Sequence, residues 1–255
     1  MNNRRVNIMP MAGEGLRFIN AGYRKPKPLI NIDGKPMFIR SAKCMPKADL
    51  WIFISQKKFL TDNLIAKEIE KNFKNYNIIS IDQATEGQAS TCSLARKYLK
   101  NDDQIFINAC DSFIEFDFKK YYAELEKYDV LVFTTKRNQI HLENPKAYGW
   151  VKVNKRGILN VSCKKPFNKE PSNERPIVGT FFFSKLKFFI NSIDSLFKKK
   201  NKINNEYYLD MAIAESVKLG FKVGEFLVDD YVDFGRPGID IYEELEKWKN
   251  NKLAD

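Results

Sequence analysis

Residues 6–17 read Val6-Asn7-Ile8-Met9-Pro10-Met11-Ala12-Gly13-Glu14-Gly15-Leu16-Arg17, a short apolar run that leads into two glycines and an arginine. The apolar run predicts a buried strand, and the glycines predict a loop directly after it. Backbone N–H groups in such a loop can approach phosphate oxygens closely. No Gly-Lys-Ser/Thr follows and the third glycine of the dinucleotide fingerprint is missing, so the segment matches neither a P-loop nor that fingerprint.

Strands and helices alternate through about the first 135 residues. Apolar runs predict strands, and apolar residues at helical spacing predict helices between them. This alternation is typical of an α/β fold, with a Rossmann-like, mostly parallel sheet and helices on both faces. The predicted strands cover residues 6–11, 51–55, 77–81, 104–109 and 130–134, and the helices cover residues 59–73, 89–99 and 118–126.

The pattern changes after residue 135. Two short apolar runs around Lys155-Arg156-Gly157 predict a hairpin, and a polar segment with prolines predicts a loop at residues 167–176. We expect further strands at residues 178–183, 223–227 and 231–234, and helices at residues 185–197, 206–219 and 239–248.

Composition restricts the class of protein. With 44% hydrophobic and 13% aromatic residues, the chain can form a full core. Its four cysteines form no Cys-x-x-Cys pair, so we expect no zinc site and a reducing, cytoplasmic location. No apolar run reaches the roughly 18 residues that a membrane helix needs. The net charge of +11 is scattered along the chain, so we expect no nucleic-acid partner, and the same charge suits a triphosphate substrate.

Two further motifs follow the glycine loop and Arg17. They are Pro26-Lys27-Pro28-Leu29 and Asp33-Gly34-Lys35-Pro36. Prolines on both sides of Lys27 fix the backbone and limit where its side chain can point. Together with the glycine loop, these motifs resemble the signature of the sugar-phosphate nucleotidyltransferases, which are also called nucleoside diphosphate-sugar pyrophosphorylases.

The resemblance extends from about residue 6 to residue 235. It implies an enzyme that joins a nucleoside triphosphate to a phosphorylated small molecule and releases pyrophosphate. It also implies one domain over residues 1–255, in which a Rossmann-like sheet carries a small β-rich extension for the substrate. The nucleotide-binding part would cover about residues 1–135 and 221–236, and the substrate-binding part about residues 136–220.

The same resemblance assigns the nucleotide contacts. Arg17 and Lys27 would hold the triphosphate and act in catalysis, and the backbone of Ala12 and Gly13 would contact the base. An amide side chain can donate to a pyrimidine carbonyl and accept from its N–H, so the sequence leaves the base open. The implied nucleotide-binding residues are Met11, Ala12, Gly13, Gly15, Gln83, Gly87 and Gln88.

Two carboxylates match the metal ligands of the family. Asp111 follows directly after the predicted strand at residues 104–109, at the sheet edge where α/β proteins bind ligands. Asp233 lies in Tyr231-Val232-Asp233-Phe234-Gly235, which resembles the family's second metal segment. Two carboxylates suffice for Mg²⁺, or for Mn²⁺, because phosphate oxygens and water complete the coordination. Asp229 and Asp230 are rivals for this role, although we interpret them as solvated loop residues.

The acceptor segment departs from the family pattern. Sugar-specific members carry Glu-Lys-Pro, whereas this chain reads Cys163-Lys164-Lys165-Pro166. A lysine at residue 164 cannot accept a hydrogen bond from a sugar hydroxyl, and it favours an anionic group on the substrate. Asp210 lies on a predicted helix that matches one closing this pocket in the family. The implied substrate-binding residues are Gly149, Lys164, Lys165, Gly179 and Glu206.

We therefore expect an acceptor that carries a carboxylate. As a whole, the chain resembles the cytidylyltransferases of capsule gene clusters, which join CTP to L-glutamine phosphate. One alternative is a sugar 1-phosphate nucleotidyltransferase that uses UTP, CTP or dTTP. Another is a metal-dependent glycosyltransferase, although that class usually shows Asp-x-Asp and this chain has Asp111-Ser112-Phe113. The sequence leaves the oligomeric state open, and we assign no role to His141, which we expect in a polar loop.

Overall fold

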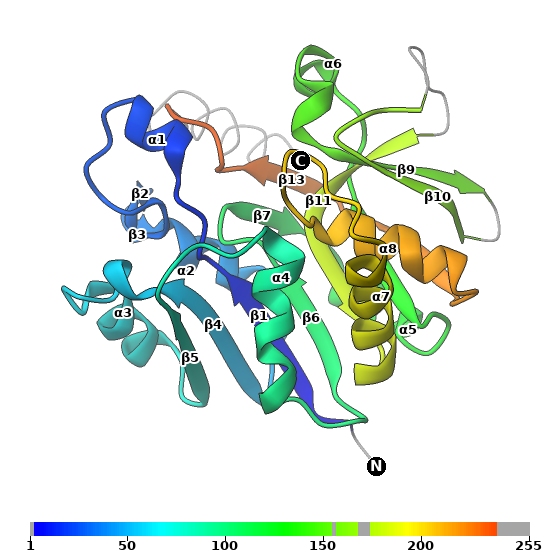
Figure 1. The fold of residues 1–255 in the computed structure, drawn as a ribbon, viewed down its shortest axis with the longest axis horizontal. Helices are drawn as coiled ribbons and strands as arrows, with labels where there is room; N and C mark the ends of the chain where they lie inside the picture. Colours follow the sequence, from blue (N-terminus) through cyan, green and yellow to red (C-terminus); the bar gives the residue numbers. More distant parts are fainter. Residues whose placement is uncertain (1–2, 155–156, 168–173, 239–255) are drawn as a thin grey trace.

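The computed structural model describes residues 3–154, 157–167 and 174–238. Within these ranges, nine strands form one mixed sheet that has helices on both faces (Figure 1). The predicted α/β class, with a Rossmann-like sheet, is confirmed. None of the helices in the described ranges is both long enough and apolar enough to cross a membrane.

The centre of the sheet is parallel. Strand β1 pairs with β4 on one side and β6 on the other, and β4 pairs with β5. Because these strands run in one direction, their carboxyl ends meet at one edge, where ligands bind in this type of sheet. The bounds are β1 Arg5–Pro10, β4 Leu50–Gln56, β5 Tyr76–Ile81 and β6 Gln104–Asn108.

Strand β11, residues Glu174–Phe183, joins the parallel centre to the rest of the sheet. Its end pairs antiparallel with β6 and β8, and its beginning pairs with β9 of the β9–β10 hairpin. The register with β8 shifts between Ile177 and Phe181, around Gly179, which has a φ of 75°. Glycine adopts this left-handed conformation without strain. The remaining strands of the sheet are β8 Val130–Thr134, β9 Gly149–Asn154, β10 Gly157–Cys163 and β12 Val223–Leu227.

Two apolar layers enclose the sheet. Along β6, Ile105 and Ile107 face one layer and Phe106 faces the other, because successive side chains in a strand point to opposite faces. The first layer packs against α4 Gln88–Ser93, α7 Leu186–Lys199 and α8 Leu209–Lys218 (Figure 1). The second packs against α2 Met37–Lys43, α3 Leu64–Asn72 and α5 Phe118–Glu124.

Short elements surround the carboxyl edge of the sheet. The most important is a separate two-stranded antiparallel ribbon, β7 Ser112–Glu115 with β13 Asp230–Asp233, which brings distant parts of the chain together. The others are α1 Leu16–Asn20, β2 Asn31–Ile32, β3 Lys35–Pro36, α6 Gln139–Glu143 and the 3₁₀ turns η1 Lys27–Leu29, η2 Lys57–Phe59 and η4 Pro145–Ala147. The remaining 3₁₀ turn, η3 Leu94–Tyr98, follows α4 and lies toward the amino end of β6.

Several predicted boundaries were wrong. The helix expected from residue 59 begins at Leu64, because Asn63 has a left-handed φ of 57°. The loop expected up to residue 176 is too long, since β11 begins at Glu174 and continues through Pro176. The helix expected from residue 206 begins at Leu209, because the backbone of Tyr207 is bonded to the loop before α4. The helix expected at residues 89–99 continues after Ser93 as a 3₁₀ turn.

The expectation for His141 was also wrong. It lies in helix α6 and is buried, with 2% of its surface exposed, instead of lying in a polar loop. The helix expected at residues 239–248 lies outside the described residues, as does the hairpin turn at residues 155–156.

Candidate active site

A cavity of about 540 Å³ opens at the carboxyl ends of β1 and β6. Most of the residues implied by the sequence line it, although they come from segments far apart in the chain. Gln83 and Lys165 are exposed and are not among the described residues that line it. The implied residues that do line the cavity are Met11, Ala12, Gly13, Gly15, Arg17, Lys27, Gly87, Gln88, Asp111, Gly149, Lys164, Gly179, Glu206 and Asp233.

A side chain at the end of strand β4 holds the glycine loop in place. The side-chain amide of Gln56 donates to the carbonyl of Ala12 at 2.6 Å, and Gln56 is buried at the carboxyl end of β4. Gly15 has a φ of 70°, and a Cβ there would lie 3.1 Å from the Cβ of Lys27. A larger residue would therefore be strained and would press on Lys27. Gln56 was not predicted, although a polar residue at the carboxyl end of a parallel strand is a recognisable signal.

Lys27 and Asp111 form an ion pair inside the cavity. Their side chains are 17% and 20% exposed, so water screens the pair only in part. Burial alone would raise the pKa of Asp111, but the charge and hydrogen bond of Lys27 outweigh burial and hold that pKa below its ordinary value. Asp111 is therefore ionised at neutral pH and already attracts a cation.

Asp233 lies beside this pair. A Cβ placed on Gly235 would lie 2.6 Å from Oδ2 of Asp111 and 2.8 Å from Oδ1 of Asp233, so both carboxylates approach the same point. The β7–β13 ribbon creates this approach, and the amide of Phe234 donates to the carbonyl of Asp111 at 2.8 Å. Burial, followed by the negative charge of Asp111, raises the pKa of Asp233. A cation between the two carboxylates would relieve this repulsion.

These two carboxylates fit a divalent cation. Oxygen ligands suit Mg²⁺, which usually takes one or two protein carboxylates and fills the remaining positions with water and phosphate. Among the described residues, no group of three or more His, Cys, Asp or Glu side chains is arranged to hold a metal. Asp229 and Asp230 do not line the cavity, and the side chain of Asp230 accepts from the amide of Tyr231 at 2.7 Å.

Another part of the cavity wall carries a lysine, Lys164, and a carboxyl group, Asp210. Lys164 adopts a left-handed φ of 61°, donates to the carbonyl of Ala147 at 2.8 Å and lies 5.0 Å from the ring centre of Tyr208. Asp210 faces Gly149, where a Cβ would fall on the carboxylate. Burial raises the pKa of Asp210 to about 6, although the nearby Lys164 charge opposes this. This part can therefore contact a polar substrate through both a cation and carboxylates.

The loop before α4 packs against the segment that carries Tyr207. The carbonyl of Glu86 accepts from the amide of Tyr207 at 2.6 Å, and the carbonyl of Tyr207 accepts from the amide of Ala89 at 2.9 Å. Gly87 has a φ of 108°, and a Cβ there would lie 2.7 Å from the carbonyl oxygen of Tyr207. Glycine is therefore required by both conformation and space. Tyr207 and Tyr208 were not predicted as site residues, because contacts between distant segments leave no local pattern.

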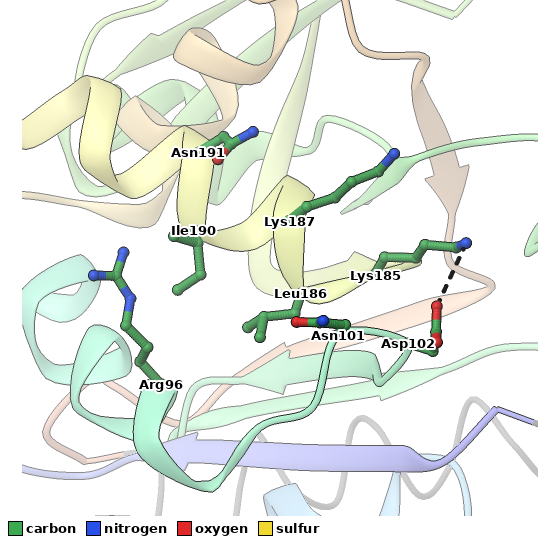
Figure 2. Close-up of a pocket in the computed structure, with 8 residues that line it drawn as sticks. All are labelled: Arg96, Asn101, Asp102, Lys185, Leu186, Lys187, Ile190 and Asn191. Carbon is green, nitrogen blue, oxygen red and sulfur yellow. Dashed lines mark ion pairs between the residues drawn. The ribbon is translucent and has the colours of Figure 1, made fainter.

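A second cavity, of about 560 Å³, lies at the other end of the sheet (Figure 2). Its lining includes Asn101 and Asp102, which precede β6, so it faces the amino end of that strand. Two of the cations that line it form ion pairs: Lys185 lies 3.6 Å from Asp102, and Arg96 pairs with Asp194. The third, Lys187, lies 4.7 Å from the ring centre of Phe188. Apart from Gln83 and Lys165, the implied site residues line the first cavity, at the carboxyl edge.

The chain matches the family model described as nucleotidyl transferase over residues 7–223. Since this match covers most of the sequence, the chain belongs to the nucleotidyl transferase family. It is similar to mannose-1-phosphate guanyltransferase beta-A of Xenopus laevis, with 26% identity over 170 residues that cover 58% of this chain and 47% of that protein. The chain thus spans about half the length of the curated relatives that it matches.

Solved structures share the fold. The nucleoside-diphosphate-sugar pyrophosphorylase from Vibrio cholerae RC9 has a TM-score of 0.75 at 18% identity, covering 91% of this chain and 97% of its own. The inositol-1-phosphate CTP transferase from T. maritima has a TM-score of 0.72 at 15% identity, covering 98% of this chain and 96% of its own. At these identities the likeness concerns the fold.

Proposed function

We propose that the protein is a nucleotidyltransferase, which joins a nucleoside triphosphate to a phosphorylated small molecule and releases pyrophosphate. The observation that carries this proposal is the convergence of Lys27, Asp111 and Asp233 beside the glycine loop. A cationic side chain, paired carboxylates and the backbone N–H groups of a glycine loop are the elements that phosphoryl and nucleotidyl transfer require. Membership of the nucleotidyl transferase family supports the same conclusion.

In this proposal, an oxygen of the acceptor phosphate attacks the α-phosphorus, and pyrophosphate leaves in line. The acceptor phosphate is largely dianionic near pH 7, so no side chain has to remove a proton from it. The chain therefore works by alignment and charge neutralisation. Arg17 and Lys27 hold the triphosphate, while Met11, Ala12, Gly13 and Gly15 support it and the base through the backbone.

We propose that Asp111 and Asp233 hold Mg²⁺, which Mn²⁺ can replace. Enzymes of this family generally use divalent metal ions. When bound, such an ion neutralises charge on the triphosphate oxygens. Lys27, which pairs with Asp111, would then be shared between this carboxylate and the triphosphate.

For the acceptor, we propose a phosphorylated compound that carries a carboxylate, with L-glutamine phosphate as the specific candidate and CTP as the nucleotide. Lys164 lines the cavity, where it can pair with a carboxylate. A CTP transferase among the structural neighbours supports a cytidine nucleotide. The product would then be a CDP-linked compound for capsular polysaccharide modification. Three expectations remain predictions. They are nucleotide binding by Gln83, substrate binding by Lys165, and the division into a nucleotide-binding part at about residues 1–135 and 221–236 and a substrate-binding part at about residues 136–220.

Two alternatives share this site. One has a sugar 1-phosphate as the acceptor, and two of the solved neighbours have names that refer to sugar substrates. A metal-dependent glycosyltransferase would also use a nucleotide and a metal, but it would release a nucleoside diphosphate.

The test is a screen for pyrophosphate release with Mg²⁺. Each of the four nucleoside triphosphates is combined with a panel of phosphorylated sugars and phosphorylated amino acids. The proposal predicts pyrophosphate with at least one pair, and the fastest turnover with CTP and a carboxylate-bearing acceptor. Faster turnover of glucose 1-phosphate would refute the acceptor assignment and leave the nucleotidyltransferase assignment intact.

A further inference from the structure

The buried side chain of His141 packs against two tyrosines beside the carboxylate pair. Its ring centre lies 4.6 Å from that of Tyr148, tilted by 59°. It lies 6.4 Å from that of Tyr231, nearly parallel at 22°. Only 2% of His141 is exposed, so the imidazole contacts other parts of the protein and not the solvent.

The start of α6 fixes the orientation of this ring. Nδ1 of His141 accepts from the backbone amide of Asn138 at 3.2 Å, and the amide of His141 donates to the Asn138 side chain at 3.3 Å. Burial, followed by the charges of Arg236 and Arg137, lowers the pKa of His141 to about 4. The imidazole is therefore neutral at pH 7, and since Nδ1 accepts a hydrogen bond, the proton lies on Nε2.

Nε2 of His141 is buried and has no hydrogen-bond partner among the described residues. Leaving a buried donor unpaired costs about 1–3 kcal/mol. Among the described residues, the ring therefore contacts its neighbours through packing against Tyr148 and Tyr231, and not through a polar contact from Nε2.

Tyr148, which packs against His141, also bonds to Asp233. Its hydroxyl donates to Oδ2 of Asp233 at 3.2 Å, while the amide of Gly235 donates to Oδ1 at 2.8 Å. Tyr231 lies two residues before Asp233 in β13, so both side chains point to the same face of the ribbon. The His141 ring thus contacts the two tyrosines that flank this carboxylate.

We propose that His141 is a positioning residue for the metal site: it holds Tyr148 in place, and the Tyr148 hydroxyl orients the Asp233 carboxylate toward a divalent cation. This inference rests on the proposed function, in which Asp233 is a metal ligand. Hydrogen bonds to ligating carboxylates fix their orientation, and loss of such a bond typically lowers metal affinity about 10- to 100-fold.

The test measures Mn²⁺ binding to the whole protein by electron paramagnetic resonance, without nucleotide and without turnover. Tyr148→Phe removes only the hydroxyl and is expected to weaken Mn²⁺ binding about tenfold. His141→Asn keeps an acceptor near the Nδ1 position but removes the ring, and it is expected to weaken binding about threefold or more. His141→Phe keeps an aromatic ring and is expected to bind Mn²⁺ within about twofold of the original protein.

The double variant His141→Asn/Tyr148→Phe separates positioning from general damage. If His141 acts through the Tyr148 hydroxyl, the double variant binds Mn²⁺ no more weakly than Tyr148→Phe alone. Additive losses, or unchanged binding in a folded His141→Asn variant, would overturn the inference. If His141→Asn does not fold, a tenfold loss in folded His141→Phe overturns it, and retained affinity there supports it.

Asp233→Asn distinguishes failure of this inference from failure of the proposed function. If Asp233→Asn binds Mn²⁺ as tightly as the original protein, Asp233 is not a ligand, and the proposed metal site itself is wrong. If Asp233→Asn loses affinity while His141→Asn and Tyr148→Phe do not, the metal site stands and the positioning role is wrong.

Discussion

Asp210 lies against Gly149, so close that a Cβ on residue 149 would fall on the carboxylate oxygen. Gly149 begins β9 and is opposite Cys163 of β10, whereas Asp210 lies in the first turn of α8. The helix, the hairpin and the Lys164 turn therefore meet at one point on the wall of the cavity. A side chain of any size at residue 149 would separate them.

This contact predicts that Gly149→Ala is destabilising. Inserting a methyl group into a packed contact costs about 1–3 kcal/mol. We expect Gly149→Ala to lower the midpoint of thermal unfolding by several degrees. Asp210→Ala in the same chain should restore part of the loss, because it removes the atoms that the new methyl group strikes. An equal loss with and without Asp210→Ala would show that the contact is not the cause.

Lys27 and Asp111 are predicted to be essential for turnover. Lys27→Ala removes a cation from the triphosphate, and Asp111→Ala removes a metal ligand, so each should lower kcat about 10²- to 10³-fold or more. Circular dichroism should show a folded protein in both cases. Arg40→Ala is a matched control, because Arg40 pairs with Asp33 and lies outside the cavity lining. Near-normal rates in either site variant would contradict the assignment.

Lys164 is predicted to select the acceptor. Replacing it with glutamate reverses the charge that would pair with a carboxylate, so Lys164→Glu should raise KM for a carboxylate-bearing acceptor about tenfold or more. KM for a sugar 1-phosphate should change less or fall. Lys164→Met keeps much of the packing against Tyr208 and separates charge from shape. Equal changes in KM for both acceptors would exclude Lys164 as the selecting residue.

Glu215 predicts a dependence of stability on pH that is independent of function. Its side chain is 5% exposed and accepts from Lys199, Lys218 and Ser195. Burial opposes ionisation, but these partners lower the pKa of Glu215 from 4.5 to about 2. The stability due to its charge is therefore complete above about pH 4.5 and is lost as pH falls toward 2.

The corresponding variant is Glu215→Gln. The side chains of Lys199 and Lys218 are 49% and 62% exposed, so solvent screening limits the expected loss at pH 7 to about 1–2 kcal/mol. Urea unfolding at pH 7, 4 and 3 should show the difference between the two proteins shrinking as pH falls. A difference that stays constant or grows toward pH 3 would contradict the role of the charge.

The parts of the site that follow strands could be predicted from the sequence. The apolar run before Gly13 and the one before Asp111 form β1 and β6, and both lead into the cavity. The α/β order follows from these runs because burial on both faces requires continuous apolar strands. Local pattern and residue type are sufficient for such elements.

The remaining features depend on contacts between distant segments. Pro176 suggested a loop because proline has no N–H, but its carbonyl accepts from Thr135 at 3.1 Å and it pairs with Trp150 within the sheet. In helix α6 the apolar Leu142 is exposed while the polar His141 is buried, which is the reverse of what residue type predicts. His141 is buried because Tyr148 and Tyr231, which come later in the sequence, pack against it. No local signal marks such packing, so its role is visible only in three dimensions.

The most direct test of the proposed activity is ³¹P nuclear magnetic resonance of a reaction with the best nucleotide and acceptor from the screen, in the presence of Mg²⁺. We predict one pyrophosphate signal and one pair of coupled diphosphate signals from the linked product, growing together in equal amounts. Asp111→Ala should slow the growth of both about 10²- to 10³-fold or more. Release of a nucleoside diphosphate in place of pyrophosphate would mean cleavage at the γ-phosphate and would contradict nucleotidyl transfer.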